Sequence, residues 1–194
     1  MTFTSRIKAI PSDIQQTMIS SGVWKPECPI PIERLRLLEV DHYAFEGNLQ
    51  HGQMVVLDQI AERSLEIFSI LLETKFPLHK IQLMDIYNGD DDASMEDNNS
   101  SCFNFRKISG TDELSIHSYG LAIDINPLQN PFLVGEKIYP SKGSEFLDRS
   151  NIRPGMIEPV VHLFKERGFE WGGDWTSPID YHHFQIPPKD LGLV

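Results

Sequence analysis

Apolar residues recur at helical spacing in one long stretch and one shorter stretch of this chain. Between residues 54 and 75 they stand three or four apart with charges between them, which predicts the main helix. Pro77 marks its predicted end. A second amphipathic helix is predicted over residues 156–167, with Pro159 tolerated in its first turn and Gly168 as its stop.

Short apolar runs predict strands at residues 35–40, 80–87, 119–125 and 182–186. Segments rich in polar residues, Pro or Gly predict an acidic loop at 88–101, a long connection at 126–151 and an extended arm at 1–36. The mixed order with few helices indicates an α+β fold, with a small antiparallel sheet flanked by helices. We expect one domain over residues 36–194 and an N-terminal extension, residues 1–35, packed on it.

The composition excludes several classes of partner. The chain has 194 residues, 40% of them hydrophobic, which suffices for a core of its own. Its net charge of -11 argues against nucleic acid or an anionic membrane as a partner. No apolar run approaches the roughly 18 residues of a transmembrane helix, and no Sec signal is visible at the N-terminus. The sequence as given predicts a cytoplasmic protein, with export by another route or a clipped signal as alternatives.

The segment from Ser115 to Asp124 carries the first candidate chemistry. His117 and Asp124 are seven residues apart, so on a straight strand they would face opposite sides. They can converge only if the chain bends between them, and Gly120 is the expected position of that bend. Ala122 is then expected to face the site together with Asp124. A loop histidine and a solvated aspartate are the alternative for this segment alone.

A second cluster lies near the C-terminus, where Asp180 precedes His183 by three residues. Two imidazoles and a carboxylate, from His117, His183 and Asp124, match the three protein ligands of a catalytic zinc site. Asp180 is the spare carboxylate that a hydrolase uses as a general base. His182 competes with His183, but adjacent strand residues point to opposite faces, so we expect His182 to lie behind the ligands or at the surface.

Other polar residues predict no further metal site. Cys28 and Cys102 lack CxxC spacing and are expected to be free thiols. The run Asp90-Asp91-Asp92 lacks the alternation, glycine and terminal glutamate of an EF-hand, so a solvated loop is expected. Arg106 could clamp a carboxylate or stabilise an oxyanion, although composition alone favours a surface salt bridge. The remaining histidines are expected to be structural or exposed: His42, His51, His79 and His162.

The pattern Ser-x-His-(x)6-Asp, followed downstream by Asp-x-x-His, resembles the zinc D-alanyl-D-alanine carboxypeptidases and dipeptidases and the related L-alanyl-D-glutamate endopeptidases, which share the fold of the Hedgehog domain. The resemblance spans roughly residues 36–186 and is closest to the carboxypeptidase-like branch. Similar stretches are Gly89–Met95, Asn98–Ser101, Phe103–Arg106, His117–Pro127 and Trp171–Trp175. Departures from the family pattern are Phe105, where Cys is common, and His182, where Pro or Met is common.

The resemblance implies roles for single residues. It makes His117, Asp124 and His183 zinc ligands and Asp180 the catalytic acid/base. It makes Arg106 the group that stabilises the substrate carbonyl or its oxyanion. Ser115 and Asn104 are implied to bind substrate, and the turn Trp171–Trp175 is implied either to line the cleft or to pack.

The implied substrate is a peptidoglycan stem peptide or its precursor. Cleavage as a D-Ala-D-Ala carboxypeptidase ranks first, and cleavage as an L-Ala-D-Glu endopeptidase, of the lysin or effector type, ranks second. A non-catalytic zinc-binding recognition module, like the Hedgehog domain, is the alternative from a different class. This alternative does not explain why the chain keeps Asp180 and Arg106 beside the zinc ligands.

Overall fold

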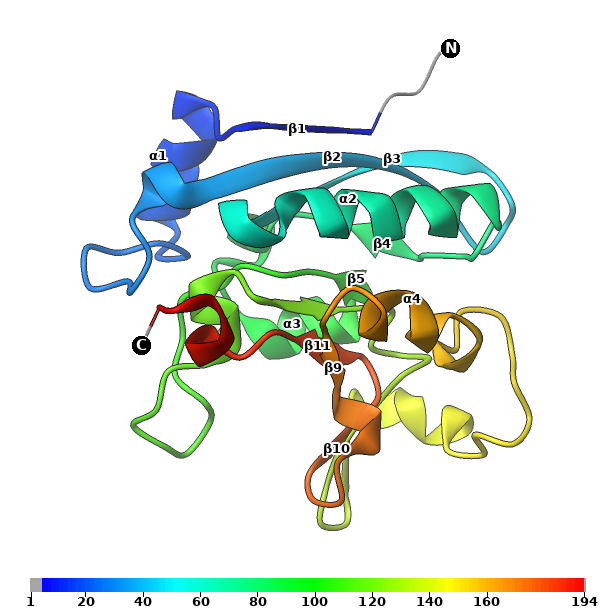
Figure 1. The fold of residues 1–194 in the computed structure, drawn as a ribbon. Coiled ribbons are helices and arrows are strands. Elements are labelled where there is room, and N and C mark those ends of the chain that lie inside the picture. The colour runs from blue at the N-terminus through cyan, green and yellow to red at the C-terminus, as the bar shows by residue number, and fades with distance from the viewer. Residues whose placement is uncertain (1–4, 194) are drawn as a thin grey trace.

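A three-stranded antiparallel sheet forms the N-terminal part of the computed structural model, which describes residues 5–193. Its order is β1 (Arg6–Ala9), β2 (Leu35–Tyr43) and β3 (Leu49–Leu57), and β2 and β3 form a hairpin. The helix α2 (Asp58–Glu73) follows β3 directly and lies along the sheet (Figure 1). Residues 1–4, which belong to the expected extension, and residue 194 lie outside the described part of the chain.

The C-terminal part is built from shorter elements that surround the candidate site. A second antiparallel sheet has the order β6 (Ala122–Asp124), β11 (His183–Gln185) and β9 (Glu170–Trp171). A third has the order β10 (Ile179–Asp180), β7 (Phe132–Val134) and β8 (Lys137–Tyr139). The short parallel pair is β4 (Lys80–Ile81) with β5 (Asn99–Ser100). Two short helices, α3 (Asp91–Glu96) and α4 (Val161–Lys165), lie here, whereas α1 (Ser12–Ser20) lies between β1 and β2 in the chain.

One hydrophobic core joins the two parts. Buried side chains of β2, β3 and α2 belong to the same cluster as those of the site strands, including Ile123 and Phe184. The Phe164 ring of α4 stacks on Phe184 with ring centroids 3.8 Å apart. The strands that carry the candidate site are therefore anchored on their apolar side by the core.

The predicted α+β class with small antiparallel sheets is confirmed. The predicted start of the main helix is wrong, because residues 54–57 belong to β3 and the helix begins at Asp58. These four residues are all buried. A short apolar run that is buried on both faces does not distinguish a strand from a helix, and the hairpin was missed for this reason.

Four further segments differ from the predictions. The predicted strand at 80–87 ends at Ile81 and continues as a 3-10 turn at Met84–Tyr87. The predicted loop at 88–101 contains α3, because the Asp90 side chain accepts a hydrogen bond from the Ala93 N–H and caps the helix. The connection at 126–151 contains the hairpin β7–β8, and the arm at 1–36 contains β1 and α1.

The remaining elements keep their predicted places: the strand expected at 35–40 is longer, as β2, and the others are shorter. The strand expected at 119–125 is Ala122–Asp124, and the strand expected at 182–186 is His183–Gln185. The helix expected at 156–167 begins as a 3-10 turn at Glu158–Val160 and continues as α4, with Pro159 in the first turn as predicted. Both cysteines are free, as predicted. Among the described residues, no helix combines the length and the apolar character needed to cross a membrane.

Glu39 of β2 fixes β1 to the sheet through two cations. Its carboxylate accepts a hydrogen bond from Lys8 Nζ at 2.6 Å and another from the Arg6 guanidinium. The Glu39 side chain is only 7% exposed. The hydrogen bond from Lys8 outweighs the effect of burial and, with Arg6, lowers the pKa of Glu39 to about 2.

Replacing Glu39 by Gln should make the protein less stable at neutral pH, by about 1 kcal/mol for partly exposed partners. Because the folded-state pKa lies below the ordinary value of 4.5, the contribution of Glu39 is full above pH 4.5. It is lost as the pH falls from 4.5 toward about 2. Urea unfolding of wild type and Glu39→Gln between pH 7 and pH 3 should show the difference shrinking. Glu46→Gln, at an exposed turn position, is the control. A difference that stays constant over this range would contradict the assignment.

Candidate metal centre

A left-handed turn at Gly120 brings His117 and Asp124 to the same place. His117 lies in a 3-10 turn, Ile116–Tyr119, whose first N–H groups are capped by Ser115: its Oγ accepts from the His117 N–H at 3.3 Å. Gly120 ends the turn with φ +66°, and β6 begins two residues later. A Cβ at Gly120 would lie 2.8 Å from the backbone nitrogen of Leu57. The bend expected at Gly120 is confirmed, and only glycine fits it without strain.

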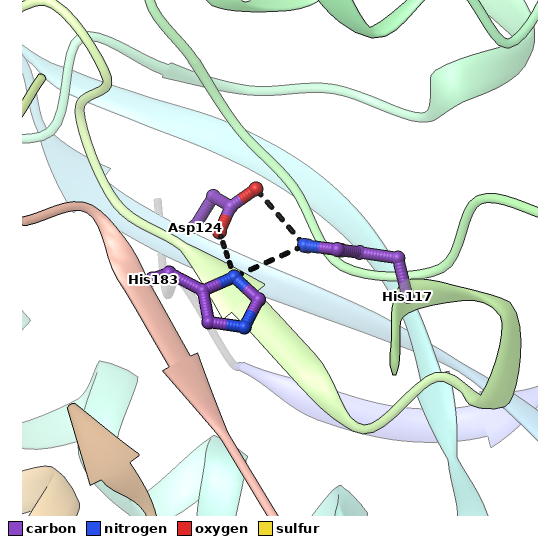
Figure 2. A group of neighbouring side chains, drawn as sticks. All are labelled: His117, Asp124 and His183. Carbon is purple, nitrogen blue, oxygen red and sulfur yellow. Dashed lines mark hydrogen bonds and ion pairs between the residues drawn. The ribbon is translucent and has the colours of Figure 1, made fainter. Parts of the chain in front are cut away.

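The pairing of β6 with β11 places the second histidine. His183 lies directly opposite Asp124 in the antiparallel register. His183 Nδ1 is 3.0 Å from Asp124 Oδ1, His117 Nε2 is 3.1 Å from Asp124 Oδ2, and the two imidazole nitrogens are 3.3 Å apart (Figure 2). All three side chains are buried. These are the three residues predicted as metal ligands, and the structure brings them together.

The hydrogen bonds behind the two imidazoles indicate which nitrogen of each is free. His117 Nδ1 lies 2.5 Å from the Cys102 carbonyl, which can only accept, so Nδ1 carries the proton and Nε2 the lone pair. His183 Nε2 lies 3.0 Å from Gln185 Oε1, which leaves the lone pair on Nδ1. Both lone pairs therefore point toward Asp124, the arrangement that a cation requires.

The spacing of these atoms fits a small tetrahedral ion. Zinc bonds of about 2.0–2.1 Å to nitrogen and oxygen place neighbouring ligand atoms of a tetrahedron about 3.3 Å apart. The two imidazole nitrogens are 3.3 Å apart, and they lie 3.0 and 3.1 Å from different oxygens of the Asp124 carboxylate. Three protein ligands also leave a fourth position for water or substrate, as in catalytic rather than structural zinc sites. Zinc binds imidazole nitrogens and carboxylate oxygens of this kind. Calcium takes oxygen ligands, so two imidazole nitrogens exclude a calcium site here.

Burial and neighbouring charge shift the pKa values of this cluster. Burial alone would raise the pKa of Asp124, but the charges and hydrogen bonds of the surrounding histidines hold it well below its ordinary value. Burial alone would lower the pKa of His183, but its hydrogen bond to Asp124 and the charges of Asp124 and Asp180 raise it to about 9. The Asp124 carboxylate thus favours positive charge on the groups beside it.

Asp180 lies beside the ligands at the end of β10. Its carboxyl is almost fully buried, and burial raises its pKa above the ordinary value. His182 Nε2 stands 3.1 Å from Asp180 Oδ1 without the alignment of a hydrogen bond, while His182 Nδ1 lies 2.8 Å from the Asn130 carbonyl. A carboxyl whose pKa is raised toward neutrality is suited to accept and return a proton.

His182 is buried, which excludes the expected surface position. It precedes the first residue of β11, so the alternation of strand side chains does not apply to it. Its Nε2 reaches within 4.0 Å of Asp124 Oδ2, farther than His183. It lies behind the ligands, against Asp180, as the other half of the prediction expected.

The three residues expected to bind substrate each contact another part of the protein. Ser115 caps the turn that carries His117, and the Asn104 amide donates to the Gly89 carbonyl at 3.1 Å. The Arg106 guanidinium pairs with Asp91 at 2.8 Å. Each therefore has a structural partner, and the salt bridge expected for Arg106 from composition is present.

The Trp171–Trp175 turn has the packing role that was one of its two expected roles. The Trp171 ring stacks on Phe184, and its Nε1 donates to the Tyr181 carbonyl at 2.9 Å, which is a packing role. The Trp175 ring lies against His183 with centroids 5.5 Å apart, so Trp175 borders the cluster.

Sequence reasoning missed the residues that orient the ligands. Gln185 is two residues from His183 on the same strand and therefore on the same face, a signal that strand alternation offers. The contact at Cys102 is made by its backbone carbonyl. Every residue has such a group, so the sequence gives no sign of this contact. At Gly172 a Cβ would lie 2.5 Å from the Asp180 carbonyl, so its glycine lets the turn approach Asp180 closely.

Replacing Gly120 by Ala should destabilise the fold by about 2 kcal/mol or more, because a left-handed φ and a steric clash coincide there. Gly110→Ala is the matched control, since Gly110 has φ +78° and nothing within 4 Å of an added Cβ. The control should lose only about 1 kcal/mol. Urea denaturation of both variants measures the two losses, and equal losses would show that the contact with Leu57 is not tight.

Two comparisons with known proteins find similarity over part of the chain. A family model described as D-alanyl-D-alanine carboxypeptidase matches residues 109–186, a narrower span than the expected 36–186. The peptidoglycan L-alanyl-D-glutamate endopeptidase CwlK of Bacillus subtilis is 40% identical over 75 residues, which are 39% of this chain and 41% of that protein. No solved structure gives a significant match. Residues 109–186 hold His117, Asp124, Asp180 and His183, so the part of the chain that carries the cluster is similar to the D-alanyl-D-alanine carboxypeptidase family.

Proposed function

We propose that this protein is a zinc peptidase that hydrolyses peptidoglycan stem peptides. The observation that carries the proposal is the buried cluster of His117, Asp124 and His183 with the Asp180 carboxyl beside it. Three ligands and one spare acid form the smallest set that metal-assisted hydrolysis needs. The family match to residues 109–186 supports the same reaction class.

The proposed cofactor is zinc, held by His117 Nε2, His183 Nδ1 and the Asp124 carboxylate. When bound, it supplies a Lewis acid that polarises a peptide carbonyl and makes water a stronger nucleophile near neutral pH. The chain's own residues then supply orientation and proton transfer. Cys102 and Gln185 hold the two imidazoles in the ligating tautomers.

Asp180 is the proposed acid and base. Its carboxylate takes the proton of the attacking water and passes it to the nitrogen of the departing amine. Burial, which raises its pKa, brings the carboxyl closer to the range in which it can perform both steps. Arg106 is the proposed partner of the substrate carbonyl oxygen as negative charge develops on it.

Carboxypeptidase cleavage of the terminal D-Ala-D-Ala bond is the first candidate reaction, since the matching family model carries that description. L-Ala-D-Glu endopeptidase cleavage is the second, since the similar protein of Bacillus subtilis is named for it. The two differ in one requirement. A carboxypeptidase must accept a free C-terminal carboxylate, whereas this endopeptidase must accept peptide on both sides of the bond.

Measured zinc content should distinguish the proposed ligand His183 from its neighbour His182. His183→Ala should lose bound zinc, whereas His182→Ala and Asp180→Ala should keep about one ion per chain. Asp180→Ala should also lose turnover by about 10²-fold or more, because general acid–base catalysis contributes that much. Elemental analysis of the dialysed proteins, with peptide hydrolysis rates, checks both. Zinc retained in His183→Ala but lost in His182→Ala would reverse the assignment of the two histidines.

Mass spectrometry of a pentapeptide muropeptide, incubated with zinc-loaded protein, tests the reaction itself. Loss of one terminal alanine is the expected result and establishes a D,D-carboxypeptidase. Release of the peptide from the L-Ala-D-Glu bond would establish the endopeptidase instead. Zinc binding without any cleavage would overturn the proposal in favour of a recognition module. Asp180→Ala is the negative control in each case.

A further inference from the structure

The guanidinium of Arg106 is held by an acidic residue of a helix that the proposed mechanism does not use. We propose that Asp91, in the first turn of α3, is a positioning residue that fixes Arg106 for the substrate carbonyl. This inference rests on the proposed function, because it assigns Arg106 to the reacting peptide. It also concerns residues outside 109–186, the span that the family model matches.

The backbone of Arg106 is tied to the turn that carries the ligand His117. The Arg106 N–H donates to Ser118 Oγ at 3.0 Å, and the Ser118 hydroxyl donates to the Arg106 carbonyl at 2.8 Å. The Ser115 N–H donates to the same carbonyl at 3.0 Å. The Asn104 N–H donates to the His117 carbonyl at 3.2 Å. The start of the Arg106 side chain is therefore fixed relative to His117.

The far end of the side chain is fixed by Asp91. Arg106 Nη2 lies 2.8 Å from Asp91 Oδ2, and the side chains are 26% and 28% exposed. Arg106 Nε is buried and has no hydrogen-bond partner among the described residues. Such a donor calls for an explanation in a folded protein. A guanidinium that is held by one nitrogen, with donors to spare and part of its surface accessible, is suited to a further acceptor.

A second contact sets the distance between α3 and the Arg106 segment. The Asn104 side-chain amide donates to the Gly89 carbonyl at 3.1 Å, one residue before the cap of α3. Asp90 then caps α3 by accepting from the Ala93 N–H at 3.0 Å. Asn104 thus joins the start of α3 to the irregular segment that leads to Arg106. The Asp91–Arg106 pair is one of two contacts between the same two segments, unlike an isolated surface ion pair.

The proposal predicts that Asp91→Asn lowers kcat about tenfold or more and changes KM little, as for other residues that orient a catalytic group. Asp92→Asn, at the exposed next position of the same helix, should be close to wild type. In an Arg106→Ala background, Asp91→Asn should lower kcat no further, because the group that it positions is gone. Steady-state kinetics on the cleaved muropeptide, with unfolding temperatures of all variants, measures this.

A second measurement does not depend on turnover. The Arg106 Nε–H signal in a nitrogen-15 NMR spectrum, identified by its loss in Arg106→Lys, should exchange slowly with water in wild type and Asp92→Asn. In Asp91→Asn it should exchange about tenfold faster or more, because the guanidinium is released. An unchanged signal, or kcat losses that add in the double variant, would overturn the proposal.

The role of Asp91 and the peptidase activity can be refuted separately. Normal turnover in Arg106→Ala would remove the role of Arg106 and with it that of Asp91, while leaving the peptidase proposal intact. Absence of turnover in wild type would instead refute the peptidase proposal and the catalytic role of the pair. In that case the exchange measurement would show only whether Asp91 fixes the guanidinium.

Discussion

The pairing of β6 with β11 is the constraint on which the candidate metal centre depends. In an antiparallel pair, directly opposite residues lie on the same face with Cβ atoms about 4.5–5.5 Å apart. The register sets His183 opposite Asp124, so it brings an imidazole and a carboxylate within reach of one ion. A slip by one residue would turn His183 to the core and Phe184 to the site. Phe184 is fully buried and stacks on Phe164, so the core opposes that slip.

Burying these polar groups together has an electrostatic cost. His117, Asp124, Asp180 and His183 are all buried, and isolated buried charges are strongly unfavourable. Each has a specific partner instead: a backbone carbonyl, a glutamine oxygen or a neighbouring histidine. Asp124 and Asp180 respond in opposite directions, with the pKa of one lowered and the other raised. Two carboxyls with divergent pKa values are what a site with one ligand and one acid/base requires.

Features that depend on neighbouring residues could be predicted from the sequence, whereas features that depend on distant segments could not. The proposed ligands and Asp180 were found because their spacing, with Gly120 between two of them, is a local pattern. The hairpin β2–β3 was missed because residues 54–57 are apolar and buried on both faces, a property that tertiary packing creates. The helix α3 was missed because it is short and acidic, and its stability depends on the Asp90 cap. The partner of His117 was missed because it is a backbone carbonyl, that of Cys102, from another segment.

The parts that sequence reasoning missed are also parts that complete the site. The Leu57 N–H, at the end of the missed hairpin, donates to the Gly120 carbonyl at 2.9 Å, and the Phe103 N–H donates to the Val55 carbonyl at 3.0 Å. These two bonds join β3 to the bend and to the segment that runs to Arg106. Asp91 comes from the missed helix. The family-matched residues 109–186 thus contain the proposed ligands, the β6–β11 pairing and Gln185, whereas the Cys102 carbonyl and the bond from Leu57 to Gly120 come from the part of the chain before residue 109. It follows that the part of the chain before residue 109 belongs to the architecture of the site, and that residues 109–186 by themselves would lack the carbonyl that orients His117 and the bond that supports the bend at Gly120.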